Sequence, residues 1–221
     1  ASIALTFTNT RDDMKRERRD ETPEEIRIQS RKLLVEDFSV DPALAEEFVY
    51  HSWYSPSQLI TIVDALKAMS QAHGKDQFIA LAVLADTPTE AHVFTRLSVI
   101  LRSWNRESGQ VSKVFPLEGL ALAMNEKGDI ALHLNIAVGY CTQGAAGQIE
   151  AIDAQLEKGE PDRQKFLLIS GSLSHLATQT ADARGWTILK DLEDYWLKDF
   201  DDLEFAPGEG DKNRILPEIG S

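Results

Sequence analysis

Three stretches in the first half of the chain share one helix-start pattern: Thr22-Pro23-Glu24-Glu25, Ser55-Pro56-Ser57-Gln58 and Thr87-Pro88-Thr89-Glu90. In each, a hydroxyl residue precedes a proline, and Glu or Gln follows two positions after the proline. The hydroxyl accepts a hydrogen bond from a first-turn N–H, and the Glu or Gln side chain reaches back to the capping residue. Proline fits the first helical position because its missing N–H has no helical partner there. The starts lie 33 and 32 residues apart, which favours stacked helical pairs but indicates no chemistry.

Apolar residues at helical spacing predict five helices between Pro23 and about Asn105. Gly74 is the expected left-handed terminator of the third helix, and the fourth is apolar nearly all round, as a buried short helix would be. The expected helices are Pro23 to about Asp37, one from Asp41-Pro42, one from Ser55, Phe78 to Ala85, and one from Thr87.

The apolar period changes to two after Asn105. Leu120 to Met124 and Ile130 to Val138 alternate on both sides of a loop that contains Gly128, which predicts a β-hairpin. Val111 to Phe115, just before Pro116, is a candidate third strand, and Ser2 to Thr10 also alternates as a short strand would.

The last part of the chain predicts two further helices among strands. An amphipathic helix with Ile149, Ile152 and Leu156 follows residues 139–147 and ends at Gly159. Phe166 to Ile169 is an expected strand, Ser174 to Arg184 a helix closed by Gly185, and Trp186 to Leu189 a strand. This strand–helix–strand unit favours a right-handed parallel crossover onto the hairpin sheet.

The predicted fold class is therefore α/β, more narrowly α+β, with an N-terminal stacked helical layer followed by a small mixed β-sheet with two packed helices. We expect an N-terminal arm (residues 1–21), a helical region (22–106), a small α/β region packed on it (107–190) and an acidic C-terminal tail (191–221).

Composition limits the possible partners. The 221 residues are 43% hydrophobic, and 36 acidic residues against 23 Lys and Arg give a net charge of −13. Such a surface repels phosphate backbones, so we expect no nucleic-acid binding, although an acidic decoy that mimics nucleic acid remains a third functional hypothesis. No apolar stretch approaches the length of a spanning helix, so we expect no membrane insertion. The first residue is Ala1 rather than Met, which indicates either that a leader was removed or that the chain was trimmed. A small residue such as Ala1 is compatible with a cleaved secretory signal, so a periplasmic or cell-envelope location is favoured over the cytoplasm.

Two strand-to-helix turns are candidate ligand sites, because backbone N–H groups and the helix dipole converge at such turns. The first spans Gly139 to Gly147 and includes Gly144, but it lacks the Lys and Ser/Thr of a phosphate loop and the spacing of a dinucleotide fingerprint. A flexible turn with close packing is the favoured interpretation, and an anion site is the alternative. The second turn contains Gly171, Ser172, Ser174 and His175. The second glycine of a nucleophile elbow is missing, and Ser174 is more simply a helix cap.

The remaining reactive residues do not form a catalytic pattern. Cys141 is the only cysteine and would become a nucleophile only with a histidine such as His133 beside it, so an inert role is favoured. The five histidines have no metal-ligand spacing, and we predict no metal, no cofactor and no catalytic residue.

Aromatic residues mark two candidate partner contacts. Trp53 and Tyr54 precede the second helix start, where aromatic residues usually staple a corner but become interface anchors when exposed. Tyr195, Trp196 and Phe200 lie in the acidic tail and are suited to clip onto another subunit.

Two segments, His51 to Leu66 and Ile169 to Trp186, resemble parts of a family of uncharacterised, exported bacterial proteins. That family has a helical N-terminal half and a strand–turn–helix–Gly-Trp segment near its C-terminal end. The resemblance implies a bacterial envelope setting and identifies no catalytic residue.

Together these features favour a non-enzymatic binding or scaffold protein, a subunit of a larger bacterial envelope assembly that holds protein partners through its terminal arms. The alternative is an enzyme or sensor that binds a small anion or nucleotide at the turns Gly139–Gly147 and Gly171–His175.

Overall fold

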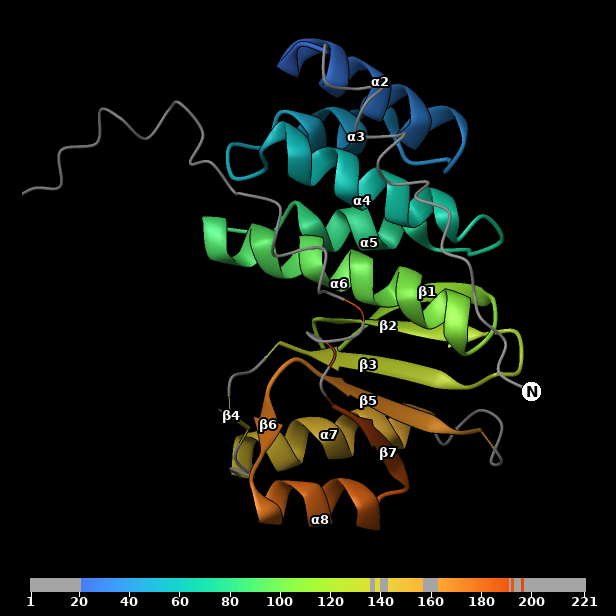
Figure 1. Cartoon of the computed structure of the whole chain (residues 1–221), viewed down its shortest axis with the longest axis vertical. Coiled ribbons are helices and arrows are strands. Elements are labelled where there is room, and N and C mark those ends of the chain that lie inside the picture. Colours follow the sequence, from blue (N-terminus) through green and yellow to red (C-terminus); the bar gives the residue numbers. More distant parts are fainter. Residues whose placement is uncertain are drawn as a thin grey trace, which may run out of the picture.

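The structure is a computed structural model that describes residues 21–135, 138–139, 143–156, 163–190, 192 and 196. It is an α+β fold in which a stack of five helices precedes a five-stranded mixed sheet, as the sequence predicts (Figure 1). The stack consists of α2 (Pro23–Glu36), α3 (Pro42–Val49), α4 (Pro56–Ala68), α5 (Lys75–Ala82) and α6 (Pro88–Glu107). The expected strand at Ser2 to Thr10 lies outside the described residues.

The three proline-led starts are helix caps, although only two are complete capping boxes. Thr22 and Ser55 each accept from the N–H of the third helical residue, whose side chain returns to the cap's own N–H. Thr87 accepts from the N–H of Glu90 at 3.2 Å, but the Glu90 carboxylate accepts from the N–H of Asp86 instead. At the start of α6 the Glu90 side chain therefore returns to Asp86, one residue before the cap, and not to Thr87 as predicted.

The fourth helix begins earlier than the sequence predicts. Gly74 has a φ of +80°, so its predicted left-handed conformation is confirmed, but α4 already ends at Ala68 and Gly74 starts α5. Since α5 spans Lys75–Ala82, the expected helix from Phe78 to Ala85 is wrong at both ends. The helix is also not buried all round, because Gln77 and Ala80 are exposed.

The sheet has the strand order β1-β2-β3-β5-β7. Its first three strands form an antiparallel meander, and β5 and β7 continue the sheet in parallel to β3, as the predicted crossover requires. Their bounds are β1 Val111–Leu117, β2 Leu120–Asn125, β3 Ile130–Leu134, β5 Lys165–Ile169 and β7 Trp186–Leu189. Strand β1 runs through Pro116 rather than ending before it, which an outer strand tolerates because one missing N–H there costs little.

The expected long strand from Ile130 to Val138 divides into two. Strand β3 ends at Leu134, and Val138–Gly139 (β4) pairs with Ser172–Leu173 (β6) in a separate two-stranded sheet. Helix α7 (Gln143–Leu156) connects the two parallel strands β3 and β5, and α8 (His175–Ala183) connects β5 and β7.

Alternate residues of the strands serve two hydrophobic cores. The first core joins the helical stack to one face of the sheet, and it includes Trp104 of α6, Ala131 of β3 and Leu168 of β5. The second core lies on the opposite face, where Leu132 and other strand residues pack against Ile152 and Leu156 of α7 and Ala181 of α8. The sheet is thus covered on both faces, with α6 on one side and α7 and α8 on the other (Figure 1).

Candidate functional site

The two glycine-containing turns identified in the sequence are brought together by the small second sheet. Val138 pairs with Ser172 and Gly139 with Leu173, in parallel. Strand β4 follows the carboxyl end of β3, and β6 follows the carboxyl end of β5. Gly139 and the second turn therefore lie at the same end of the main sheet, as the ligand hypothesis requires, while residues 140–142 of the first turn lie outside the described residues.

In the second turn, Ser174 has a structural role. Ser174 caps α8 by accepting a hydrogen bond from the N–H of Ala177 at 3.2 Å. His175 is the exposed first residue of that helix, Ser172 is exposed, and Gly171 is half-buried. The capping interpretation of Ser174 is confirmed.

The glycines of the first turn lie elsewhere than expected. Helix α7 begins at Gln143, so Gly144 and Gly147 belong to the helix and not to the turn. Gly147 is exposed, and a Cβ atom built there would meet no atom within 4 Å. Close packing therefore does not explain Gly147, which corrects the prediction for that residue.

The topology also disfavours a nucleotide site at this edge. In open α/β sheets, ligands bind at the point where the strand order reverses and helices cross to opposite faces. Among the described strands, the order follows the chain without reversal, and α7 and α8 pack on the same face. This winding does not create the crevice at a strand-order reversal that such nucleotide sites use.

The structure joins a histidine and a serine that the sequence did not pair. Nε2 of His133 lies 2.7 Å from Oγ of Ser170. His133 is near the end of β3, and Ser170 directly follows β5, in which Leu168 is the register partner of His133. The parallel register thus places Ser170 just beyond His133, on the sheet face that α6 covers. His133 lies two residues after the buried Ala131, so both side chains are on the same face of β3, and this spacing is the signal in the sequence that points to its burial.

The electrostatics of this pair oppose general-base catalysis. Burial and the positive charge of Arg96 together lower the pKa of His133 to about 3. A general base that activates serine must become imidazolium, and active sites stabilise that cation with a carboxylate. Here a buried environment and a neighbouring guanidinium disfavour it. The His133–Ser170 contact therefore acts as a buried hydrogen bond that ties the ends of β3 and β5 together.

A second buried polar cluster pins α7 to the sheet. Asp153 of α7 is 5% exposed, and one of its carboxylate oxygens lies 2.8 Å from Nζ of Lys165 and 3.0 Å from Nε1 of Trp186. Nη1 of Arg184 lies 3.6 Å from the other oxygen. Every partner comes from β5, β7 or the turn before β7, so the cluster fixes the crossover helix against the parallel strands.

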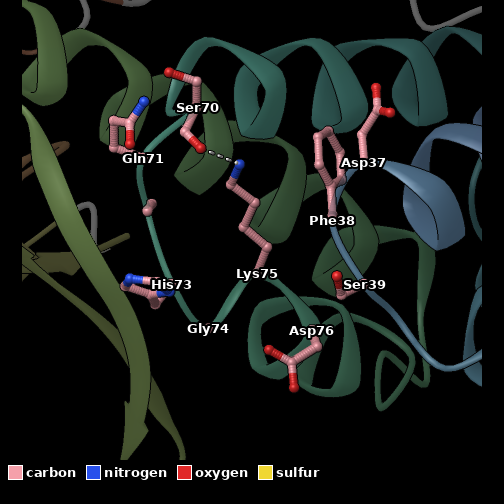
Figure 2. Close-up of a pocket in the computed structure, with 10 residues that line it drawn as sticks. Asp37, Phe38, Ser39, Ser70, Gln71, His73, Gly74, Lys75 and Asp76 are labelled. Carbon is pink, nitrogen blue, oxygen red and sulfur yellow. Dashed lines mark hydrogen bonds between the residues drawn. The ribbon is translucent and has the colours of Figure 1, made fainter.

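An open pocket lies away from the sheet edge, between the end of α2 and the loop that joins α4 to α5 (Figure 2). It has a volume of about 420 Å³. Its floor is the turn His73–Gly74–Lys75, and the Lys75 side chain extends between Phe38 and the Ser70 backbone (Figure 2). No pattern of charge or period in the sequence distinguishes Lys75 from a surface lysine.

Lys75 is an unusual lysine because it is only 5% exposed. Nζ donates to the carbonyl oxygen of Ser70 at 3.3 Å and lies 4.6 Å from the centre of the Phe38 ring. Burial lowers the pKa of Lys75, and the nearby Asp37 carboxylate partly opposes that change. The pocket thus holds a buried charged group that faces open volume.

The aromatic partner residues fall into three groups. Tyr54 is 2% exposed and donates its hydroxyl to the Ala82 carbonyl at 2.8 Å, so it belongs to the core. Trp53 is half-buried against the first core. Trp196 is half-buried and donates from Nε1 to Glu107 at 2.9 Å, while Tyr195 and Phe200 lie outside the described residues.

Metal and membrane features are absent from the part of the chain that the structure describes. There, no three His, Cys, Asp or Glu residues are placed to hold a metal ion, and Cys141 lies outside that part. None of the described helices combines the length and the apolar composition that crossing a membrane requires.

Comparisons with known proteins found no relative of this chain. The chain matches no protein-family model, no curated protein and no solved structure.

Proposed function

We propose that this chain is a non-enzymatic binding protein that acts as a subunit of a larger assembly. The observation that carries the proposal is an exposed apolar and aromatic surface at the far end of the helical stack, on α2 and the residue after α3. We name it the α2–α3 end surface and define it by Glu24, Arg27, Ile28 and Tyr50.

The α2–α3 end surface combines exposure with order. Ile28 is 58% exposed and Tyr50 is 48% exposed. The Tyr50 hydroxyl donates to Glu24 at 2.6 Å, and the Arg27 guanidinium lies 5.5 Å from the Tyr50 ring centre. Ile28 lies one helical turn after Glu24 and so on the same face of α2. Tyrosine and arginine are enriched at protein interfaces, and these are already held in place, which lowers the entropy cost of binding.

The polar groups with catalytic potential support the non-enzymatic part of the proposal. His133 is buried beside Arg96, a setting unsuited to a general base, and Asp153 is enclosed by cationic and indole donors. Both groups hold strands and helices together. Groups that stabilise the fold in this way are not available to a substrate.

The described part of the chain begins at Glu21, whose carboxylate accepts from Gln29 of α2 at 3.2 Å. Residue 21 is thus the last residue of the predicted N-terminal arm and is joined to the helix that carries the α2–α3 end surface. The proposal includes a contribution of the terminal arms, residues 1–21 and 191–221, to partner binding.

Affinity purification of the full chain from its native cells tests the proposal. We expect a protein partner to co-purify with the wild type and with Leu84→Glu, because Leu84 is 67% exposed on a different part of the stack. We expect Ile28→Glu and Tyr50→Ala to lose that partner while keeping the wild-type thermal stability. Retention of the partner by both variants would refute the α2–α3 end surface. A monomer with no partner, unchanged when both arms are removed, would refute the assembly.

A bacterial envelope location is part of the same proposal. Its support is the resemblance of His51 to Leu66 and Ile169 to Trp186 to exported bacterial proteins. Fractionation of native cells tests it, and recovery of the chain with cytoplasmic markers would contradict it.

Small-ligand binding at the paired turns is the second candidate function. One observation favours it, the β4–β6 pairing that sets the two turns side by side. A thermal-shift screen with nucleotides and anions tests it, because a ligand that binds only the folded state raises the unfolding temperature. A shift that Gly171→Val abolishes and Gly147→Ala preserves would favour this candidate over the protein-binding proposal.

A further inference from the structure

The Lys75 pocket is distinct from both surfaces considered above. It lies where the end of α2 meets the α4–α5 loop, and its ten lining residues come only from 37–39 and 70–76 (Figure 2). The α2–α3 end surface and the carboxyl edge of the sheet contribute none of them. Any ligand of this pocket is therefore independent of the proposed assembly.

The floor of the pocket is fixed by the sheet. The N–H of His73 donates to Ser112 at 2.9 Å, and its carbonyl accepts from Val114 at 2.8 Å, so the loop forms a bridge to β1. Gly74, in its left-handed conformation, lies directly against the Val114 carbonyl. Because hydrogen bonds to β1 already hold this loop in place, a ligand does not have to order it, which lowers the entropy cost of binding.

The pocket contains the buried Lys75 ammonium, which forms no ion pair with a described residue, although the Asp37 carboxylate is near enough to favour its charged form. Among the described residues, no carboxylate lies within ion-pair distance of Lys75 Nζ, and its contacts are the Ser70 carbonyl and the face of Phe38. An ammonium group can donate three hydrogen bonds, so the single bond to the Ser70 carbonyl at 3.3 Å leaves further N–H donors of Lys75 available to a ligand. A buried charge is costly unless it is paired, and an anionic group that enters the pocket would supply the missing pair.

The rim carries the opposite charge. Asp37 and Asp76 line the pocket and are exposed, one from the end of α2 and one from the first turn of α5. A simple anion would be attracted by Lys75 but repelled by both carboxylates. A ligand with an anionic and a cationic group satisfies both parts of the pocket.

We propose that the Lys75 pocket binds a small zwitterion of the amino-acid class, with the ligand carboxylate on the Lys75 ammonium and the ligand ammonium at the Asp37 and Asp76 rim. Ser39, Ser70 and Gln71 also line the pocket and carry side-chain groups that can form hydrogen bonds. A volume of about 420 Å³ accommodates a molecule of this class.

Titration of the ¹⁵N-labelled full chain tests the proposal, with amide chemical shifts as the readout. The probes are alanine and serine as zwitterions, acetate as the anion alone and methylammonium as the cation alone. We expect the zwitterions to shift the amides of residues 37–39 and 70–76. We expect acetate and methylammonium to bind at least about ten-fold more weakly, since each lacks one charge-assisted contact.

Matched variants separate the two ends of the ligand. Lys75→Met keeps the apolar stem and should abolish zwitterion binding, whereas Lys67→Met, at an exposed lysine at the end of α4, should leave it unchanged. Asp76→Asn should weaken zwitterion binding and leave acetate binding equal or tighter. The spectrum of each variant reports whether it is folded.

Three outcomes would overturn the proposal. The first is the absence of shifts at residues 37–39 and 70–76 with either zwitterion at millimolar concentration. The second is acetate binding as tightly as alanine, which would indicate a simple anion site. The third is unchanged alanine binding in folded Lys75→Met.

Discussion

Replacement of Gly74 by alanine should destabilise the fold far more than the same change at another left-handed glycine. A Cβ atom at Gly74 would lie 2.0 Å from the Val114 carbonyl oxygen, a distance that no relaxed structure accepts. The φ of +80° adds a conformational cost of about 1–2 kcal/mol for a residue with a side chain. To clear the oxygen, the loop must move from β1 and lose both backbone hydrogen bonds of His73, which costs roughly 0.5–1.5 kcal/mol for each bond. The total loss in the free energy of unfolding is therefore about 2–5 kcal/mol.

Gly119→Ala supplies the matched control for Gly74→Ala. Gly119 has a φ of +77°, but a Cβ atom there meets nothing within 4 Å. It should therefore show the conformational cost alone, about 1–2 kcal/mol. Urea denaturation followed by circular dichroism measures both variants, and the excess loss in Gly74→Ala reports the contact between the loop and β1. Equal losses in the two variants would refute the close approach of Gly74 to Val114.

Three further changes test the roles assigned to buried polar groups. His133 has a folded pKa of about 3 against an ordinary 6.5, so the unfolded chain binds the extra proton between these values and stability falls as the pH drops below 6.5. The limiting slope is about 1.4 kcal/mol per pH unit, and urea denaturation at pH 7 and pH 5 should show a smaller acid loss in His133→Asn than in the wild type. Tyr54→Phe leaves the buried Ala82 carbonyl without its side-chain donor and should lower the free energy of unfolding by about 1 kcal/mol in the isolated chain; no loss would contradict the core role of the hydroxyl. Asp153→Ala leaves Lys165 unpaired in the interior and should cost about 3–5 kcal/mol in the same assay, whereas a loss within error would show that the cluster does not hold α7.

The helical half of the fold was predictable because its signals are local. A hydroxyl residue followed by proline and then Glu or Gln defines a helix start within four residues, and Thr22 and Ser55 cap as complete boxes. The error at α5 arose because Lys75, Asp76 and Gln77 are polar and resemble a turn. Gly74 in a left-handed conformation lets the helix begin directly after it, and the contact with β1 that requires this conformation is invisible in the sequence.

The sheet was predictable in its pairing and less so in its ends. Alternation around Gly128 identified β2 and β3, and the strand–helix–strand pattern after Phe166 identified the parallel crossover. Alternation continues past Leu134, so the sequence indicated one long strand. Where that strand stops depends on β6, which pairs with Val138 and Gly139 from a position more than thirty residues further along the chain.

The candidate site residues were hardest to predict because their properties come from tertiary contacts. Ser170 meets His133 only because β3 and β5 are parallel neighbours in a particular register. Lys75 differs from the other lysines through its burial against Phe38 and Ser70, which belong to separate segments of the helical layer. A single sequence gives the type of each residue and the spacing of apolar residues, and neither predicts which distant side chains come into contact.

The position of α6 explains why the helical stack and the sheet behave as one unit. The sequence predicted one apolar face on α6, whereas the helix is buried on two sides, against α4 and against the sheet, where Trp104 lies 6.4 Å from the Phe166 ring. The second buried side contains hydroxyl residues whose hydrogen bonds are made within α6. Thr95 donates to the Ala91 carbonyl at 2.8 Å, and Ser98 donates to the Thr95 carbonyl at 2.7 Å. Polar residues of this kind read as solvent-facing in a periodic pattern, yet they can be buried because each finds its acceptor in its own helix. A displacement on one side of α6 is passed to the other side, because close-packed side chains are nearly incompressible. If the α2–α3 end surface binds a partner as proposed, close packing connects that partner through α4 and α6 to the sheet.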